Sequence, residues 1–557
     1  MACQISRWFE RLPGMRRRFV LLVVAAGCLP ATLATAQEPP QGKNCEGLAQ
    51  TLTLPDGKIT SAEVVAAGAF VQPNLRPDEK PWPGYKITPA FCRVRATLAP
   101  TPSSDIKVEV WMPVSGWNGK FRGVGNGGFA GYIGYQGLAE SVRLGYASAS
   151  TDTGHATTDA EWALGQPEKI VDYGYRAVHL MTADAKSVVQ AFYGSAARLS
   201  YFAYCSNGGR QALMEAQRYP ADYDGIIAGA PANNWTNMLT GGLHLLQVMD
   251  GPGYIPGAKT PAIAKAVNAA CDAKDGTVDG VVDDPPACHF NPEVMLCKGA
   301  ETDSCLTAPQ IASLKAIYAG LKDPSGKLIS PGIPPGAEDG PGGWGAWIFG
   351  KEEGKSIGAF FVTGDFSNMV YDAKDWNFRT ANVESALKLA DEKTGAVMNA
   401  TDPNLKPFFA RGGKLILYHG WNDPAISAYN SINYYNSVKQ AVGANETDAS
   451  MRLYMVPGMQ HCAGGPGATS FGQDQAAVPH DAQHDIFAAL VDWVEKGNAP
   501  SSLIASKMPE NAASDPPPPG SLKPEMTRPL CPYPQEMKYS GKGDPHLASS
   551  FSCVGGK

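Results

Sequence analysis

Short apolar runs that end in small residues recur along much of the chain, and stretches with helical spacing separate most of them. The runs predict strands at residues 106–114, 144–150, 199–204, 225–230, 414–419 and 451–456. Apolar positions three and four residues apart predict helices at 171–193, 208–219 and 480–496. Strands that alternate with helices indicate an α/β protein whose parallel sheet is covered on both faces.

This alternation stops between residues 233 and 410, where Gly, Pro and Asp are frequent. The stretch predicts an inserted domain between a first core segment at 37–232 and a second at 411–557. Residues 37–100 are polar, and we expect mostly loops there. The proline-rich residues 515–520 predict a rigid extended spacer. We expect Cys531 and Cys553 to hold the tail that follows it.

Composition narrows the class of protein. Hydrophobic residues make up 44% of the 557 residues and charged residues only 18%, so a disordered chain or a coiled coil is disfavoured. The net charge is −6, and no basic block occurs after the N-terminal region. A nucleic-acid partner is therefore not expected.

The first 36 residues predict an export signal. Arg16, Arg17 and Arg18 precede an apolar run at 19–29, which is too short to span a bilayer. The small residues at 34–36 fit a cleavage site, and a lipoprotein site at Cys28 is the less favoured alternative. No later segment is apolar enough for a transmembrane helix, so we expect a secreted or periplasmic protein.

Ten cysteines lie beyond the predicted signal, and an even number in an exported chain indicates disulfides. They are Cys45, Cys92, Cys205, Cys271, Cys288, Cys297, Cys305, Cys462, Cys531 and Cys553. Cysteine-bound zinc is disfavoured, because no Cys-x-x-Cys pair occurs.

Ser206 lies between a predicted strand and a predicted helix, where an α/β-hydrolase places its nucleophile. That tight turn needs small residues two positions away. Gly208 meets the requirement, but Tyr204 occupies the position where glycine is usual. An ordinary strand-to-helix turn is the alternative interpretation.

The order of candidate residues along the chain favours catalysis. Asp423 follows the strand at 414–419, and His461 follows the next strand. The order Ser, Asp, His is that of an α/β-hydrolase triad, in which His461 takes the proton of Ser206 and Asp423 orients the imidazole. An Asx turn at Asp423 and an ordinary loop histidine at His461 are the alternatives.

Neighbouring residues add to this hypothesis. A bond between Cys205 and Cys462 would tie the nucleophile to the histidine loop. An oxyanion hole needs two backbone N–H donors, and Asn207 supplies one candidate. The second is expected from the glycine-rich residues 125–129, at Gly128 or Gly127.

An acidic stretch at 272–283 predicts a calcium site, because calcium prefers six to eight hard oxygen ligands. The predicted ligands are the side chains of Asp272, Asp275 and Asp279 and the carbonyls of Thr277 and Val281. The spacing differs from that of an EF-hand, and a solvated acidic loop is the alternative.

Two other polar patterns are weaker. His480 and His484 could bind a metal but are better explained as a polar helix face, and residues 151–155 form a turn that could line the cleft.

These residues together resemble the tannase and feruloyl esterase family, which includes mono(hydroxyethyl) terephthalate hydrolases. The resemblance lies in residues 205–210, 419–423, 458–462, 272–283 and 528–534 and covers nearly the whole chain after the signal. It implies an α/β-hydrolase core with a large lid inserted after Ala230, a calcium site in that lid, and the triad Ser206, Asp423 and His461. It also implies the disulfides Cys45–Cys92, Cys205–Cys462, Cys271–Cys288, Cys297–Cys305 and Cys531–Cys553.

The predicted function is hydrolysis of esters of aromatic acids, with a small-molecule substrate that is free or linked to a plant polymer. Feruloyl, galloyl and terephthalic-type acyl groups are all compatible with the resemblance. The predicted ring contacts in the lid are Trp344, Trp347, Phe349, Phe360 and Phe361, with core packing as the alternative. A calcium-dependent carbohydrate-binding protein on a hydrolase scaffold is the alternative from another class.

Overall fold

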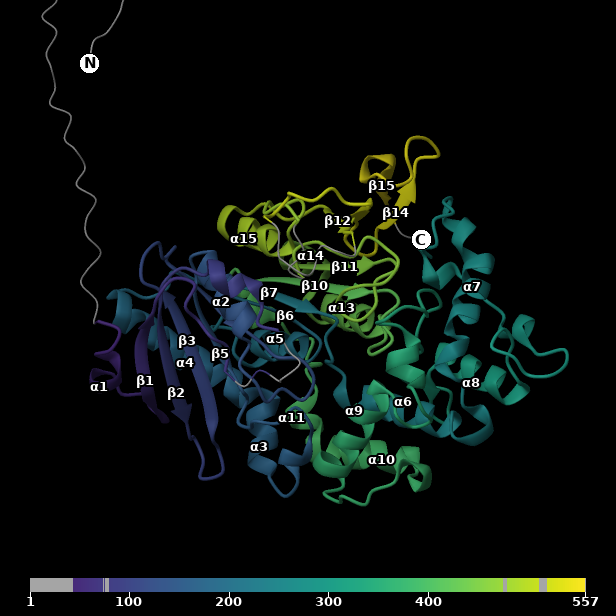
Figure 1. Ribbon diagram of the computed structural model, residues 1–557, viewed down its shortest axis with the longest axis horizontal. Coiled ribbons are helices and arrows are strands. Elements are labelled where there is room, and N and C mark those ends of the chain that lie inside the picture. Colours follow the sequence, from purple (N-terminus) through teal and green to yellow (C-terminus); the bar gives the residue numbers. More distant parts are fainter. Residues whose placement is uncertain (1–43, 74, 76–79, 474–477, 510–517, 556–557) are drawn as a thin grey trace, which may run out of the picture. The chain divides into compact units, whose positions relative to one another are not determined.

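A nine-stranded sheet organises the fold in the residues that the computed structural model describes, which are 44–73, 75, 80–473, 478–509 and 518–555 (Figure 1). The predicted signal peptide at 1–36 lies outside them. The strand order is β1-β2-β3-β5-β4-β6-β7-β10-β11. The bounds are β1 Gly57–Val65, β2 Phe91–Leu98, β3 Ile106–Pro113, β4 Lys120–Val124, β5 Ala147–Thr151, β6 Leu199–Cys205, β7 Gly225–Gly229, β10 Lys414–Gly420 and β11 Met451–Val456.

The sheet is mixed rather than fully parallel. β5, β4, β6, β7, β10 and β11 run parallel, whereas β1, β2, β3 and β5 pair antiparallel. Each predicted strand has a counterpart, but β1, β2 and β4 were not predicted, and β1 and β2 lie in the stretch where mostly loops were expected. β1 is an edge strand with only one buried position, so it lacks the apolar signal of a core strand.

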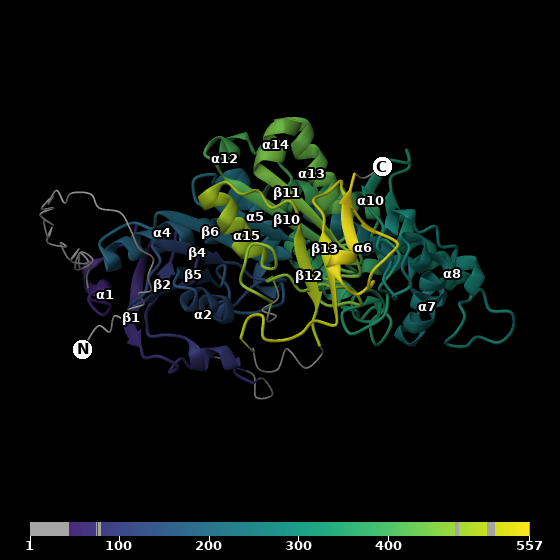
Figure 2. The ribbon, with the colours of Figure 1, turned by 90° about the horizontal axis from the view of Figure 1, so that it is seen from above.

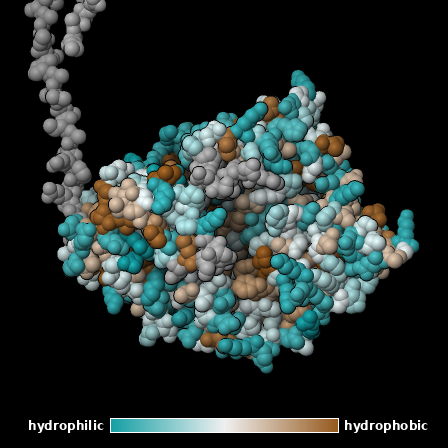
Figure 3. Space-filling model, in the orientation of Figure 1, coloured by the Kyte–Doolittle hydropathy of each residue, from teal (hydrophilic) through white to brown (hydrophobic). Residues whose placement is uncertain are grey.

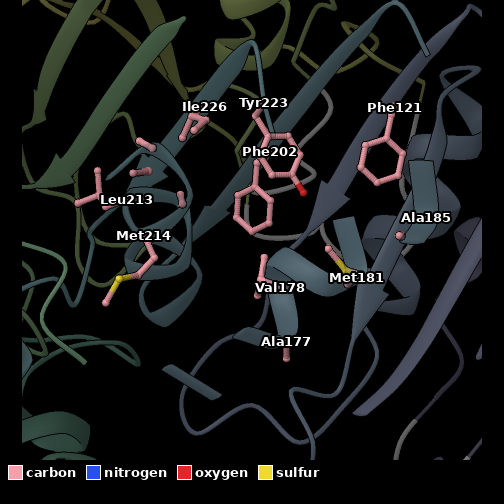
Figure 4. Close-up of a cluster of buried hydrophobic side chains, with 14 of the residues drawn as sticks. Phe121, Ala177, Val178, Met181, Ala185, Phe202, Leu213, Met214, Tyr223 and Ile226 are labelled. Atoms are coloured by element: carbon pink, nitrogen blue, oxygen red, sulfur yellow. The ribbon is translucent and has the colours of Figure 1, made fainter. Parts of the chain in front are cut away.

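Both faces of the sheet are buried, because neighbouring residues of a strand enter different hydrophobic clusters. In β6, Phe202 belongs to a cluster that also includes residues of α4 (Ala177–Tyr193), α5 (Asn207–Arg218) and α13 (Tyr429–Val442), part of which Figure 4 shows. Tyr201 instead packs with α15 (Ile486–Lys496). α2 (Tyr135–Arg143) contributes Leu138 and Val142 to a further cluster with Trp111. This double burial explains the nearly continuous apolar character of the central strands.

The chain between β7 and β10 adds no strand to the large sheet within the described residues. Its helices are α6 Trp235–Val248, α7 Thr260–Cys271, α8 Ala308–Ala319, α9 Ile357–Asp365, α10 Val383–Ala390, α11 Ala396–Met398 and α12 Lys406–Ala410, with the strand pair β8 Leu321–Lys322 and β9 Leu328–Ser330. One hydrophobic cluster lies wholly within this insertion, and a second joins it to Phe129 and Tyr173 of the core. The insertion is therefore anchored on the side that carries the glycine-rich loop.

The C-terminal residues form two small antiparallel sheets. β12 (Leu503–Lys507) pairs with β13 (Met526–Leu530) (Figure 2), and β14 (Glu536–Tyr539) pairs with β15 (Phe551–Val554) (Figure 1). A disulfide joins Cys531 to Cys553, and residues 515–517 of the predicted spacer lie outside the described residues. The remaining helices are α1 Leu48–Thr51, α3 Pro167–Val171 and α14 Ala444–Ser450. Among the described helices, none has the length and apolarity needed to cross a membrane.

Candidate active site

Ser206 occupies the whole connection between β6, which ends at Cys205, and α5, which begins at Asn207. So short a turn forces a positive φ of 64° with ψ of −125° on Ser206, which is strained for a residue with a side chain. The ring of Tyr204 packs against the backbone of Gly208. A Cβ at position 208 would lie only 2.2 Å from Tyr204 Cδ1, so a residue with a side chain there would clash with the ring. Gly208 therefore makes room for the tyrosine that replaces the usual glycine.

The three side chains predicted as a triad meet at the carboxyl ends of their strands. His461 Nε2 lies 2.9 Å from Ser206 Oγ, and His461 Nδ1 lies 2.8 Å from Asp423 Oδ2. Asp423 is buried, and its other oxygen accepts the N–H groups of Ala425 and Ile426 at 2.8 and 3.0 Å. Burial alone would raise the pKa of Asp423, but the neighbouring His461 and His419 hold this pKa well below its usual range. The carboxylate is thus a permanent anion beside the imidazole.

His419 is a further contact of Asp423 that the sequence did not indicate. Its Nε2 lies 3.4 Å from Asp423 Oδ2 and 3.0 Å from the Ile426 carbonyl, while its Nδ1 lies 2.7 Å from Ser431 Oγ. The available signal was that His419 opens the 419–423 segment that carries the family resemblance. His419 helps to fix the carboxylate before the substrate arrives.

The structure joins the cysteines in the five pairs that the resemblance implies, namely Cys45–Cys92, Cys205–Cys462, Cys271–Cys288, Cys297–Cys305 and Cys531–Cys553. The second pair connects the residue before Ser206 to the residue after His461 across 257 positions of sequence. A covalent link at this point restrains the distance between the candidate nucleophile and the candidate base.

The glycine-rich loop lies against the candidate nucleophile, since Gly128, Ser206, Asn207 and His461 line one cavity. Its two candidate donors differ. The Gly127 N–H donates to the Tyr132 hydroxyl at 2.7 Å, so it already has a partner within the protein. Gly128 and Asn207 are therefore the better pair for an oxyanion hole.

Two cavities meet at Ser206 and His461, and Figure 3 shows that one face of the molecule is hollowed near its middle. The smaller has a volume of about 140 Å³ and a mostly apolar lining that includes Trp235, Leu239 and Ile426. The larger, about 800 Å³, includes polar residues such as Arg122 and Glu140. A substrate with one apolar arm and one polar arm would place the bond between them at Ser206.

The structure divides the five predicted aromatic contacts. Trp347 and Phe361 line both cavities and stack on each other with ring centroids 6.1 Å apart, and Trp347 packs edge-on against His461 at 4.8 Å. Trp344 and Phe349 are 0% and 1% exposed inside the insertion, so they are core residues. Phe360 is 45% exposed and lines neither cavity. The prediction was therefore wrong for Trp344, Phe349 and Phe360.

The acidic loop is closed by its own carboxylates. Asp272 accepts the N–H groups of Asp279 and Gly280, and Asp275 accepts those of Thr277 and Asp283. These bonds gather the acidic side chains of residues 272–283 around one turn. Asp279 also pairs with Arg528 of the C-terminal tail, a cation that the sequence analysis did not connect to this loop.

One carboxylate of this loop lacks a donor. Asp283 Oδ1 is buried without a hydrogen-bond partner, and burial together with the nearby Asp275 and Asp279 raises the pKa of Asp283 well above its usual range. A buried, unpartnered carboxylate oxygen among other carboxylates is a place where a cation lowers the energy. The donor set, which is all oxygen, suits calcium, and the chain's residues are compatible with such an ion.

The two weaker polar patterns have structural roles. Asp152 accepts the N–H groups of Lys107 and Gly154, and the His155 ring bonds the Phe129 carbonyl at 2.6 Å, so the turn at 151–155 supports the glycine-rich loop. α15 begins at Ile486 rather than at 480, because Asp485 caps it by accepting two backbone N–H groups. His480 and His484 therefore precede the helix, which corrects the predicted start.

Comparisons with known proteins agree with this geometry. A model of the tannase and feruloyl esterase family matches residues 92–554. An uncharacterized esterase of Xanthomonas campestris is 40% identical over 98% of this chain and 96% of its own length. Feruloyl esterase B of Aspergillus niger is 31% identical over 94% of this chain and 98% of its own length. The crystal structure of feruloyl esterase B from Aspergillus oryzae covers 92% of this chain and 99% of its own, with a TM-score of 0.82 and 27% identity.

Proposed function

The chain belongs to the tannase and feruloyl esterase family of carboxylic ester hydrolases, and on that premise we propose that it is an exported serine esterase acting on esters of aromatic acids. The observation that carries the proposal is the continuous contact from Ser206 through His461 to Asp423. The reported relatives are named as esterases, so the carbohydrate-binding alternative has no support from them.

Acylation follows from the protons at these atoms. His461 Nε2 takes the proton from Ser206 Oγ while Oγ attacks the ester carbonyl, and the Asp423 anion stabilises the imidazolium that forms. The negative charge that develops on the carbonyl oxygen is met by the N–H groups of Asn207 and Gly128. Imidazolium then donates its proton to the departing alkoxide, which leaves the acid bound to Ser206 as an ester.

Deacylation repeats the sequence with water. His461 removes a proton from water, the hydroxide attacks the acyl carbon, and Ser206 Oγ leaves with the proton returned by His461. The free acid and the unchanged serine result, so each turnover hydrolyses one ester.

The two cavities support the choice of substrate. The stacked rings of Trp347 and Phe361 border the smaller apolar cavity, which suits a flat aromatic acyl group. His244 also lines it, and burial lowers the pKa of His244, so a neutral imidazole is available to bond a ring substituent. The larger and more polar cavity suits the alcohol, either a small diol or a sugar.

A substrate panel tests the proposed acyl group. We expect methyl ferulate, methyl gallate or mono(hydroxyethyl) terephthalate to be cleaved with a higher kcat/KM than methyl esters of straight-chain acids. Phe361→Ala should lower kcat/KM for the best aromatic ester about tenfold, which corresponds to about 1.4 kcal/mol of lost transition-state binding.

Phe360→Ala is the matched control, because Phe360 is the adjacent aromatic residue on α9 and lines neither cavity. It should retain nearly all of the activity. Equal losses in the two variants, or a preference for straight-chain acids, would contradict the assignment of the aromatic arm while leaving the triad untouched.

Export is supported by the five disulfides, because such bonds persist in oxidising compartments. The apolar run at 19–29 with its preceding arginines supplies the signal in this proposal. Expression with and without residues 1–36 in a bacterial host, followed by fractionation, tests it. Export of the truncated chain would contradict it.

We further propose that Asp272, Asp275, Asp279 and the carbonyls of Thr277 and Val281 hold a structural calcium ion, with Asp283 as an additional neighbour. The support is the all-oxygen donor set and the orphaned Asp283 Oδ1 described above. The ion would offset the repulsion among these carboxylates and fix the disulfide-closed loop, and no step of ester hydrolysis requires it.

Calcium removal should therefore lower the Tm and reduce activity only as the insertion loses order. Differential scanning calorimetry with calcium and with EGTA measures the effect. Asp275→Ala should abolish the response to calcium, whereas Asp303→Ala, which changes an exposed carboxylate elsewhere in the insertion, should preserve it. Immediate loss of turnover at an unchanged Tm would instead indicate a catalytic ion.

A further inference from the structure

A second cluster of metal-ligand side chains lies at the end of α5 remote from Ser206. His179 on α4, Glu215 on α5 and Asp222 in the loop after α5 each place a potential ligand atom so that all three atoms lie within 4.8 Å of one another. Glu215 follows Ser206 by nine residues, or about 13 Å along the helix, so the cluster is separate from the triad. Neither the sequence pattern nor ester hydrolysis accounts for it.

Glu215 is the group that points to a ligand. Its residue is 1% exposed, and its carboxylate oxygens receive no N–H donor but face the carboxylate of Asp222. A buried carboxylate without donors carries a large desolvation penalty unless a cation or a proton compensates it. Without such compensation the buried Glu215 carboxylate would destabilise the folded protein, so the compensating species has to be identified.

The other two side chains define what could enter. His179 Nδ1 lies 2.6 Å from Asp222 Oδ2, and the His179 ring stacks on Tyr219 with centroids 3.7 Å apart, which fixes the imidazole plane. The side chains of His179 and Asp222 are 31% and 15% exposed, so an ion can reach the cluster from solvent. Lys186 donates its ammonium group to the backbone carbonyl of Asp222, and its charge acts on the carboxylates of Asp222 and Glu215 from there.

We propose that His179, Glu215 and Asp222 form a binding site for a divalent transition-metal ion, with zinc as the best match. One imidazole nitrogen and two carboxylate oxygens are a common three-ligand set for zinc, and a water molecule can complete a tetrahedral shell. Calcium and magnesium fit less well, because both prefer oxygen ligands throughout. The site thus differs in chemistry from the acidic loop at 272–283.

The bound ion would join three elements, of which α4 and the loop after α5 are already linked by the His179–Asp222 contact. It would tie α4 to the C-terminal half of α5 and to the loop that leads into β7. Since α5 also begins at the oxyanion residue Asn207, the ion would hold the helix on which the nucleophile turn is built. Its expected effect is a higher Tm by linkage, not a chemical role.

Isothermal titration with Zn²⁺ of full-length protein that is saturated with calcium tests this site. We expect one high-affinity equivalent per chain, a higher Tm, and a visible absorption spectrum of tetrahedral type when Co²⁺ replaces Zn²⁺. His179→Phe, which keeps a ring on Tyr219, and Glu215→Gln and Asp222→Asn, which keep the side-chain shapes, should each weaken binding at least about tenfold. Loss of an outer-shell partner alone costs about that much.

His484→Ala is the matched control. His484 Nδ1 lies 2.8 Å from Asp481, so the pair repeats the imidazole–carboxylate contact, but among the described residues no third ligand completes it. This variant should bind zinc like the wild type. Zinc affinity unchanged in the three site variants would overturn the proposal. A wild type that binds no zinc would overturn it as well.

Discussion

Replacement of Ser206 by alanine should lower kcat at least about a thousandfold for every ester that the enzyme hydrolyses. The reason is that Oγ forms the acyl-enzyme in the proposed mechanism, and it lies 2.9 Å from His461 Nε2, the proposed base. Steady-state kinetics with a chromogenic ester measure the loss. KM should change much less, since the cavities keep their lining.

The same variant should fold normally. Alanine removes one oxygen from a residue whose backbone is already held by the Gly229 carbonyl and by the start of α5. Circular dichroism and an unchanged Tm would establish this. A folded variant that keeps more than about a tenth of the activity would refute the role of Ser206, because loss of a triad member costs far more than that.

The change Asp423→Asn should lower kcat by about ten-thousandfold. Asparagine has nearly the shape of aspartate, but it is neutral and cannot stabilise the imidazolium of His461. Because the pKa of Asp423 is held well below its usual range, wild type carries this anion at any working pH. The ratio of wild-type to variant activity should therefore stay large from pH 6 to pH 9, in a profile of kcat against pH. Because folding lowers the pKa of Asp423, the contribution of this anion to stability is fully present above about pH 4 and is lost as the pH falls further.

Asp152→Asn is the comparison that isolates this effect. Asp152 is also a buried acid at the end of a central strand, but it bonds backbone N–H groups of a turn, and burial raises the pKa of Asp152 to about 7. Its replacement should reduce activity far less than Asp423→Asn. If Asp152→Asn were crippling and Asp423→Asn mild, the acid of the triad would have been assigned to the wrong residue.

The catalytic candidates could be predicted because each signal is local. Ser206 lies in a turn between a strand and a helix, and Asp423 and His461 each follow the end of an apolar run. Parallel strands bring such ends to one edge of the sheet, so chain order alone places the three side chains together. β1 was missed for the opposite reason, because its polar, exposed residues at a sheet edge carry no apolar periodicity.

The insertion shows where sequence reasoning stops. Trp344, Trp347, Phe349, Phe360 and Phe361 are alike as a pattern of aromatic residues, yet two are core, one is on the surface and two line the cavities. Neighbouring residues on a helix point about 100° apart. Which of them faces Ser206 depends on how the insertion docks on the core, and that docking is a long-range contact that no local pattern encodes.

The sequence by itself determined the fold class, the order and identity of the candidate triad residues, and the acidic composition of the loop at 272–283, because each rests on residue type and near spacing. The tertiary structure decided which glycine N–H is available to an oxyanion hole, since the Gly127 N–H already donates to the Tyr132 hydroxyl. It also decided that His179, Glu215 and Asp222 meet, since they are brought together only when α4 packs beside α5. Hydrogen-bond partners and shared ligands depend on distances across the fold, and those distances exist only after the sheet and its helices have packed.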